Sequence, residues 1–417
     1  MNKILKSALY TLLVLAIYRL GTYITMPFVN SVIFSPDALF SKDSVFRILT
    51  RYSGAQLDNA SIFSLGIGPY ISASLICNGL FNNLPSLKEK LKLEGNALLE
   101  KYTLYATVPI AINSARIVLN SILDGYQVNT SLLYPNTNLK LFYLTGMTCL
   151  VSGTMFLVWL SDLLTERGFG NGSSFIISAS ILSNLPKNLT YIREDGQLTL
   201  YLFTALAILM FTMFVETAVR KIPLIYPHKA KYSKIFKSED SYLPLKANLA
   251  GVIPSIFTYQ VMGLSGVFTR WVSQKLGVAS NSPLLSFAGK FENIVTILMI
   301  IGVSYVYMDT YFRPEDISKR LQNKPVGVIE GVRPGQNTKD YIDRSARRMI
   351  FMGAIYISLI TILTKYLYVF FKFRTTPVLS GTSILIVATS SIDIVNRIGS
   401  QISSMLAVKN IFKKAQK

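Results

Sequence analysis

The chain is 417 residues long, and 51% of it is hydrophobic while 15% is charged. Soluble domains carry about 25% charged residues, so this composition, with a mean hydropathy of +0.40, excludes an ordinary soluble protein and indicates a membrane protein. The formal net charge of +20 fits either an acidic partner such as nucleic acid or the basic cytoplasmic loops of a membrane protein.

A membrane-spanning helix needs about 20 mostly apolar residues, and ten segments approach that pattern. In chain order they cover approximately 4–24, 62–84, 103–122, 141–164, 172–186, 198–219, 247–268, 293–312, 349–368 and 377–396. The fifth is short and rich in serine, so we expect it to face protein or water rather than lipid. The sequence therefore predicts an all-α membrane protein with ten transmembrane helices.

Five of these helices fall in residues 1–186 and five in residues 187–417. Because five is odd, the two halves are inverted relative to each other, as in many transporters, and we expect a central pore between them. Lysine and arginine gather in the tail and in the loops after helices two, six and eight, on the face that also carries both termini. The positive-inside rule makes that face cytoplasmic, in a multi-pass plasma-membrane protein.

Two of the cytoplasmic loops, 220–246 and 313–348, mix basic residues with proline and aromatic residues beyond what topology requires. They are either docking surfaces for a cytoplasmic partner or simple positive-inside loops. Most of the net charge is explained by topology, so we expect no nucleic-acid partner.

Helices two and seven share a short signature, Gly-[Ile/Val]-x-Pro-x-Ile, at 66–71 and 251–256. Glycine and proline loosen a membrane helix, and a matched pair of interrupted helices in two halves points to a transport path. The alternative is that each proline simply starts or kinks a helix.

Helical spacing places isoleucine on one face of each signature helix. Ile67 and Ile71 are four residues apart, with Asn78 further along the same face, while Ile256 shares its face with Gln260. A solute transporter would place charge or several polar groups at such a site. Isoleucine favours a hydrophobic constriction that blocks water by dewetting, although packed or lipid-facing isoleucine is the commoner case.

The sequence offers no catalytic chemistry. It has no phosphate-binding loop of the Gly-x-x-x-x-Gly-Lys-[Ser/Thr] type, no triad and no metal-ligand spacing around His228. The two cysteines, Cys77 and Cys149, lie in apolar runs and read as small core residues. We therefore expect no enzyme activity and no cofactor, with energy supplied by a partner.

Five segments carry a resemblance to a known family. They are ASIFSLGIGPYISASLI at 60–76, TERGFGNGSSFIISASILSNLP at 165–186, LPLKANLAGVIPSIF at 243–257, GVRPGQNTKDY at 331–341 and GTSILIV at 381–387. In this order they resemble the SecY family, the channel subunit of the bacterial protein-export translocon, over nearly the whole chain. The resemblance implies a protein-conducting channel, with a solute transporter, an insertase or a scaffold as the competing readings.

The resemblance also implies roles for particular residues. The family's pore ring would fall on six isoleucines, called the isoleucine ring below: Ile67, Ile71, Ile177, Ile181, Ile256 and Ile386. Its plug would cover about 43–54, with the apolar residues Val45, Phe46, Ile48 and Leu49. Helices two and seven would form a lateral gate towards lipid, which includes Pro69, Asn78, Pro254 and Gln260.

The family's partners would be a SecA-type motor ATPase, small SecE-like and SecG-like membrane subunits, and the exported preprotein. Motor docking would use Arg220, Lys221 and the loop-tip residue Arg333. The chain lacks the usual amphipathic lead and the familiar glycine-rich basic stretch after helix two, and its tail is short. These edges resemble the accessory-system SecY paralogue of Gram-positive bacteria, which exports serine-rich glycosylated adhesins, rather than the housekeeping protein, and they argue against ribosome docking more than against motor docking.

Overall fold

The structure is a computed structural model in which part of the chain is described. The described residues are 2–30, 60–84, 86–87, 89–90, 95–128, 133–134, 138–194, 198–225, 242–258, 283–312, 314–323, 328–370 and 381–415. The expected plug, with Val45, Phe46, Ile48 and Leu49, and the expected gate residue Gln260 lie outside them.

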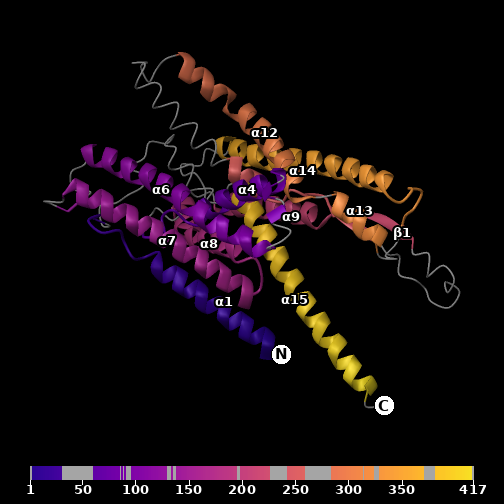
Figure 1. The fold of residues 1–417 in the computed structure, drawn as a ribbon. Coiled ribbons are helices and arrows are strands. Elements are labelled where there is room, and N and C mark those ends of the chain that lie inside the picture. Colours follow the sequence, from indigo (N-terminus) through magenta and orange to yellow (C-terminus); the bar gives the residue numbers. More distant parts are fainter. Residues whose placement is uncertain are drawn as a thin grey trace.

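The helices of the first half pack around α7. They are α1 (Asn2–Gly21), α4 (Gly68–Asn83), α6 (Asn96–Val128), α7 (Leu139–Arg167) and α8 (Gly172–Glu194). Helix α7 contacts α1, α6 and α8, and α4 lies against α6 (Figure 1). Close approach depends on small residues, as is usual between membrane helices: a Cβ on Gly153 of α7 would collide with the carbonyl of Ile62.

The second half contains α9 (Leu198–Thr217), a helical segment at 253–258, α12 (Pro283–Tyr311), α14 (Gln336–Phe370) and α15 (Gly381–Ala415). Helix α14 contacts α12 and α15, and α15 also contacts α9. The halves meet where α8 contacts α15 and α9, and where α4 contacts α12. Figure 1 shows α15 running out of this assembly to the C-terminus in the lower part of the view, where the N-terminus of α1 also lies.

Among the described residues, five helices are long and apolar enough to span a membrane by length and composition. They are Ile4–Gly21, Leu139–Arg167, Leu198–Thr217, Asn293–Tyr311 and Gln336–Thr364. The other expected spans fall on the more polar helices α4, α6, α8 and α15 and on the segment that starts at residue 253. The mostly helical architecture agrees with a ten-helix membrane protein.

Several expected boundaries differ from the structure. Helix α4 begins at Gly68 rather than at residue 62, because turns occupy 62–67 and Gly66 has a φ of 61°, which a right-handed helix does not accommodate. Helix α14 begins at Gln336, well before residue 349. Its first turns are polar and carry the ion pair between Arg347 and Asp343, so a hydropathy window does not detect them.

The loops expected at 220–246 and 313–348 contribute to a small sheet, which was not predicted from the sequence. Strand β1 (Val219–Ile225) pairs antiparallel with β2 (Tyr242–Lys246) and with β3 (Val328–Ile329), in the order β2-β1-β3. The short helix α13 (Pro314–Asn323) lies beside α14. A compact apolar cluster of Ile222, Leu245, Ile329 and Ile342 holds the sheet against α14.

Two larger apolar clusters organise the membrane region. One lies within the first half, around α6 and α7, and includes Leu119, Phe142 and Leu150. The other, called the central cluster below, collects buried residues of α1, α7, α8, α12, α14, α15 and the two signature segments. The central cluster is therefore the place where both halves contribute to one core.

Candidate pore constriction

Both signature segments start a helix in the same way. Gly66 has a φ of 61° and Gly251 a φ of 65°, and in each segment the second helical residue is a proline, Pro69 or Pro254. Glycine takes a positive φ at little cost, and proline suits the first turn of a helix because it lacks the N–H that would stay unpaired there. Each signature therefore begins a helix and does not interrupt one. This agrees with the alternative interpretation, in which each proline simply starts a helix.

The backbone hydrogen bonds repeat as well. The carbonyl of Ile67 accepts from the N–H of Tyr70 at 3.1 Å and of Ile71 at 3.3 Å. The carbonyl of Val252 accepts from Ser255 at 3.1 Å and Ile256 at 3.3 Å. These equal distances make Ile67 the counterpart of Val252, and Ile71 the counterpart of Ile256.

A second pair of anchors starts α8 and α15. Gly172 donates its N–H to the Thr165 hydroxyl at 2.9 Å, and Gly381 donates to the Thr364 hydroxyl at 3.1 Å. Each threonine donates in turn to the carbonyl four residues earlier, at 2.9 Å in both cases. A Cβ on either glycine would collide with that same carbonyl, so only glycine fits.

This anchor sets the register of the two helices. Ile177 and Ile386 each lie five residues after the anchoring glycine, so they are counterparts. Ile177 and Ile181 are four residues apart on one face of α8.

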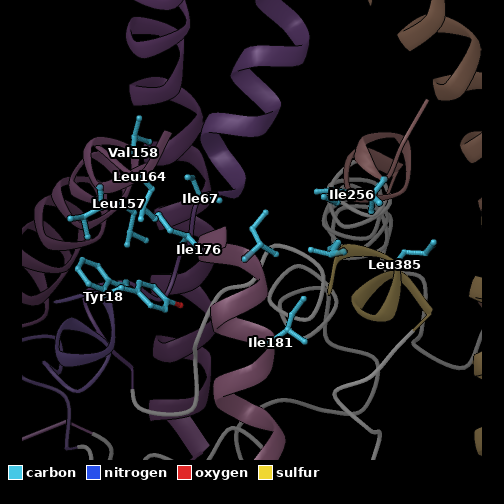
Figure 2. Packing of buried hydrophobic residues seen from close by; sticks show 14 of the residues in the cluster. Tyr18, Ile67, Leu157, Val158, Leu164, Ile176, Ile181, Ile256 and Leu385 are labelled. Carbon is cyan, nitrogen blue, oxygen red and sulfur yellow. The ribbon is translucent and has the colours of Figure 1, made fainter. Parts of the chain in front are cut away.

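The structure brings the isoleucine ring into the central cluster. Ile67, Ile177, Ile181, Ile256 and Ile386 are buried members with at most 5% of their surface exposed, and Ile71 packs against the cluster. Figure 2 shows Ile67 and Ile176 among side chains of the first half, Ile256 and Leu385 on the opposite side, and Ile181 between the two groups. All six are aliphatic, so any passage between them would be apolar and would shed water.

The seam between α4 and α12 is polar near one end. The Asn82 amide donates to the Thr310 carbonyl at 2.6 Å, from one half to the other. Asn78, one turn earlier, donates instead to the carbonyl of Ser74 on its own helix at 2.7 Å. The described bonds of Asn78 thus stay within α4, whereas Asn82 links the two helices, as does the hydrogen bond between Ser74 and Tyr311.

A buried polar contact holds the turn before the second signature. Asn248 donates to Glu216 of α9 at 2.7 Å and to the Gly251 carbonyl at 3.2 Å. Asn248 is 2% exposed and Glu216 is 8% exposed. A hydrogen bond to a carboxyl group is stronger between buried residues than between exposed ones. The Asn248–Glu216 bond therefore fixes the turn against α9.

The expected docking residues lie on and beside the small sheet. Arg220 and Lys221 are exposed on β1, and the Lys221 ammonium lies 4.7 Å from the centre of the Tyr242 ring on β2. Arg333 is exposed in the turn between β3 and α14, where its carbonyl accepts from the Thr338 hydroxyl at 3.0 Å. Pairing of β1 with β3 brings the two loops to the same end of the molecule.

Sequence reasoning missed Val252, Asn82 and the anchoring threonines. Val252 lies inside the signature at the position that matches Ile67, and this match could have identified it as a member of the ring. Asn82 depends on a contact with a segment far away in the chain, for which a single sequence gives no signal, and the threonines contact the glycines of the following helices, which helical spacing does not report. Among the described residues no group of histidine, cysteine, aspartate and glutamate has the arrangement of a metal site.

Comparison with known proteins gives one family. The SecY family model matches residues 61–395. The protein translocase subunit SecY of Buchnera aphidicola is 32% identical over 99% of this chain and 96% of its own length. The solved structure described as "The structure of a protein conducting channel" superposes with a TM-score of 0.66 at 14% identity, covering 97% of this chain and 93% of that one.

A second solved structure shows the same fold. Sec61 in the canine ribosome-channel complex from the endoplasmic reticulum superposes with a TM-score of 0.63 at 14% identity, over 96% of this chain and 92% of that one. The family match, the Buchnera relative and these folds agree with one another. The chain therefore belongs to the SecY family.

Proposed function

We propose that this chain is the protein-conducting channel subunit of a Sec-type translocase, which passes unfolded preproteins across the plasma membrane. The observation that carries the proposal is the convergence of six isoleucines from both halves on one buried cluster. The SecY relative and the protein-conducting channel with the same fold support it. The chain itself supplies no enzyme activity, and a partner motor hydrolyses ATP.

The isoleucine ring acts as the seal. A ring of aliphatic side chains blocks ions at rest because water does not fill a narrow apolar passage. It still yields to an extended polypeptide, because isoleucine side chains form no strong bond that a passing chain would have to break. Ile67, Ile71 and Ile256 lie at the starts of helices that glycine and proline set at an angle to the preceding chain.

The lateral gate lies between the first signature helix, with Pro69 and Asn78, and the second, with Pro254 and Gln260. Helix α12 continues this surface, because α4 contacts it and Asn82 links the two. One hydrogen bond of this kind contributes about 1 kcal/mol, so a signal sequence that offers apolar surface replaces it readily. The plug at about 43–54 closes the outer side of the ring.

A cytoplasmic motor of the SecA type docks on the basic end of the molecule. Arg220, Lys221 and Arg333 present positive charge from two loops that the sheet joins into one surface. Small SecE-like and SecG-like subunits cover the lipid-facing helices, and both termini are cytoplasmic. The accessory export system, with serine-rich glycosylated adhesins as substrates, is the assignment favoured by the loop after helix two, which has no glycine-rich basic stretch.

A cysteine in place of Ile71 tests the channel directly. We expect it to crosslink to a preprotein arrested during export, because the ring surrounds the passing chain. A cysteine in place of the lipid-facing Leu298, which is 63% exposed, is the matched control and should not crosslink. Equal labelling of both positions, or none at Ile71, would contradict the channel and favour a scaffold or insertase.

Charge reversal tests the docking surface. Arg333→Glu should weaken motor-driven export while the protein still inserts, because a reversed charge facing an acidic partner slows or misplaces docking. Lys140→Glu at the exposed start of α7, outside both loops, serves as the control for a general change in charge. Normal motor binding and export by Arg333→Glu would remove this residue from the docking surface.

A further inference from the structure

The repeated anchors match every position of α8 to a position of α15. Counting from Gly172 and Gly381, the counterpart of Ile177 is Ile386. The same count, nine residues after each glycine, makes Ser390 the counterpart of Ile181. One half therefore places isoleucine where the other places serine.

Ser390 is bonded across the boundary between the halves. Its hydroxyl lies 2.7 Å from the hydroxyl of Ser178 on α8, and the two side chains belong to residues that are 4% and 7% exposed. Ser390 also donates to the Val387 carbonyl at 3.0 Å. Either hydroxyl can donate the cross-helix bond, and when Ser178 donates it Ser390 is free to donate to the Val387 carbonyl.

The counterparts of the two serines are apolar. The counterpart of Ser178, six residues after its glycine, is Val387, and the counterpart of Ser390 is Ile181. Ile181 belongs to the central cluster (Figure 2), and Val387 packs against that cluster. The serine pair thus has apolar counterparts, although the backbone anchors repeat.

We propose that Ser390 occupies the ring position matched to Ile181, and that the Ser178–Ser390 hydrogen bond fastens the two halves together in the closed channel. This rests on the proposed channel function. When α8 and α15 separate around a passing chain, the bond breaks and both hydroxyls meet water or the polypeptide backbone. Their hydration offsets only part of the loss, so the bond still favours the closed state, and wetting the apolar side chains Ile181 and Val387 also drives reclosure.

The resting leak of ions through reconstituted vesicles tests the fastening. Ser178→Ala and Ser390→Ala should each raise the leak about fivefold, the shift that follows from losing one buried hydrogen bond. The double variant should leak no more than the stronger single variant, because both remove the same bond. Ser391→Ala is the control, since the Ser391 hydroxyl donates to the Val387 carbonyl of its own helix at 2.7 Å.

Additive effects of Ser178→Ala and Ser390→Ala, or an equal rise with Ser391→Ala, would overturn the proposal. A second experiment does not depend on leak. Cysteines at positions 178 and 390, in a chain whose Cys77 and Cys149 are replaced by alanine, should form a disulfide with a mild oxidant, since the hydroxyls are 2.7 Å apart. The oxidised channel should stop preprotein export, and a reductant should restore it.

Different outcomes would overturn the fastening and the channel function. Export by the oxidised, crosslinked protein at the rate of the reduced one would overturn the fastening and leave the channel function standing. Failure of the cysteines to crosslink would contradict the proximity on which the proposal depends. If neither the reduced variant nor the wild type exports preprotein when the motor is present, the proposed function itself is contradicted.

Discussion

The two halves of the molecule are alike in backbone and different in side chains. Each starts one helix with a positive-φ glycine followed by proline, and another with a glycine bonded to a threonine. The first half fills the matched positions with isoleucine throughout. The second half places Val252, Ile256, Ile386 and Ser390 there. The glycine anchors therefore fix where the ring side chains stand, and the side chains alone decide how apolar the ring is.

The largest expected effect comes from filling an anchor. Gly172→Ala and Gly381→Ala should each destabilise the protein by more than about 3 kcal/mol, because the new Cβ meets a backbone carbonyl that cannot move aside. Thermal unfolding in detergent measures this. Gly302→Ala in α12, where a Cβ meets nothing within 4 Å, is the control and should be neutral or slightly stabilising.

The buried amide of Asn248, which is bonded to α9, comes next. Asn248→Ala should cost about 1–3 kcal/mol, because it leaves the buried carboxyl of Glu216 without this donor. Unfolding by denaturant in detergent is the measurement. An unchanged stability would mean that the contact does not hold the turn before the second signature.

Removing the anchoring hydroxyls should destabilise the protein to different degrees in the two halves. Thr364→Val should cost about 1–2 kcal/mol, since Thr364 is 3% exposed and the Gly381 N–H loses its partner. Thr165→Val should cost less, because Thr165 is exposed and water replaces its hydroxyl. Thr148→Val, whose hydroxyl donates only to carbonyls of its own helix, is the control. Equal costs at Thr165 and Thr364 would contradict the role given to burial.

A smaller effect is expected at the second signature. Gly251→Ala should cost about 1–2 kcal/mol from its φ of 65° alone, because a Cβ there meets nothing within 4 Å. The same control, Gly302→Ala, separates backbone strain from added volume. A neutral Gly251→Ala would show that the turn does not need glycine.

The smallest effect is expected at the α4–α12 seam. Asn82→Ala should ease gate opening by about 0.5–1.5 kcal/mol, because it removes the bond to the Thr310 carbonyl. Crosslinking of a signal sequence to α4 reports the change. Asn78→Ala breaks a bond within α4 only and should leave the gate unchanged, so a larger effect there would reverse the assignment of the seam residue.

Much of the architecture was predictable from the sequence, because long apolar runs and basic loops report directly on membrane helices and topology. Spacing and the shared signature singled out Ile67, Ile71 and Ile256, and the family resemblance added Ile177, Ile181 and Ile386; all six gather at one cluster. The small sheet was not predictable, since β1 pairs with β3 across about a hundred residues of chain. Asn82 and Ser390 were missed for the same reason: their partners, Thr310 and Ser178, lie in the other half.

The seal formed by the isoleucine ring is the central claim, and ion leak tests it most directly. The double variant Ile71→Asn and Ile256→Asn, reconstituted into vesicles without motor or preprotein, places one amide in each half at matched positions. The account predicts a large increase in leak, because polar groups let water fill the constriction. The variant with leucine at both positions, which keeps the passage apolar, should stay sealed. Tight vesicles with the asparagine variant, or equal leak from both variants, would contradict a hydrophobic seal built from the two halves.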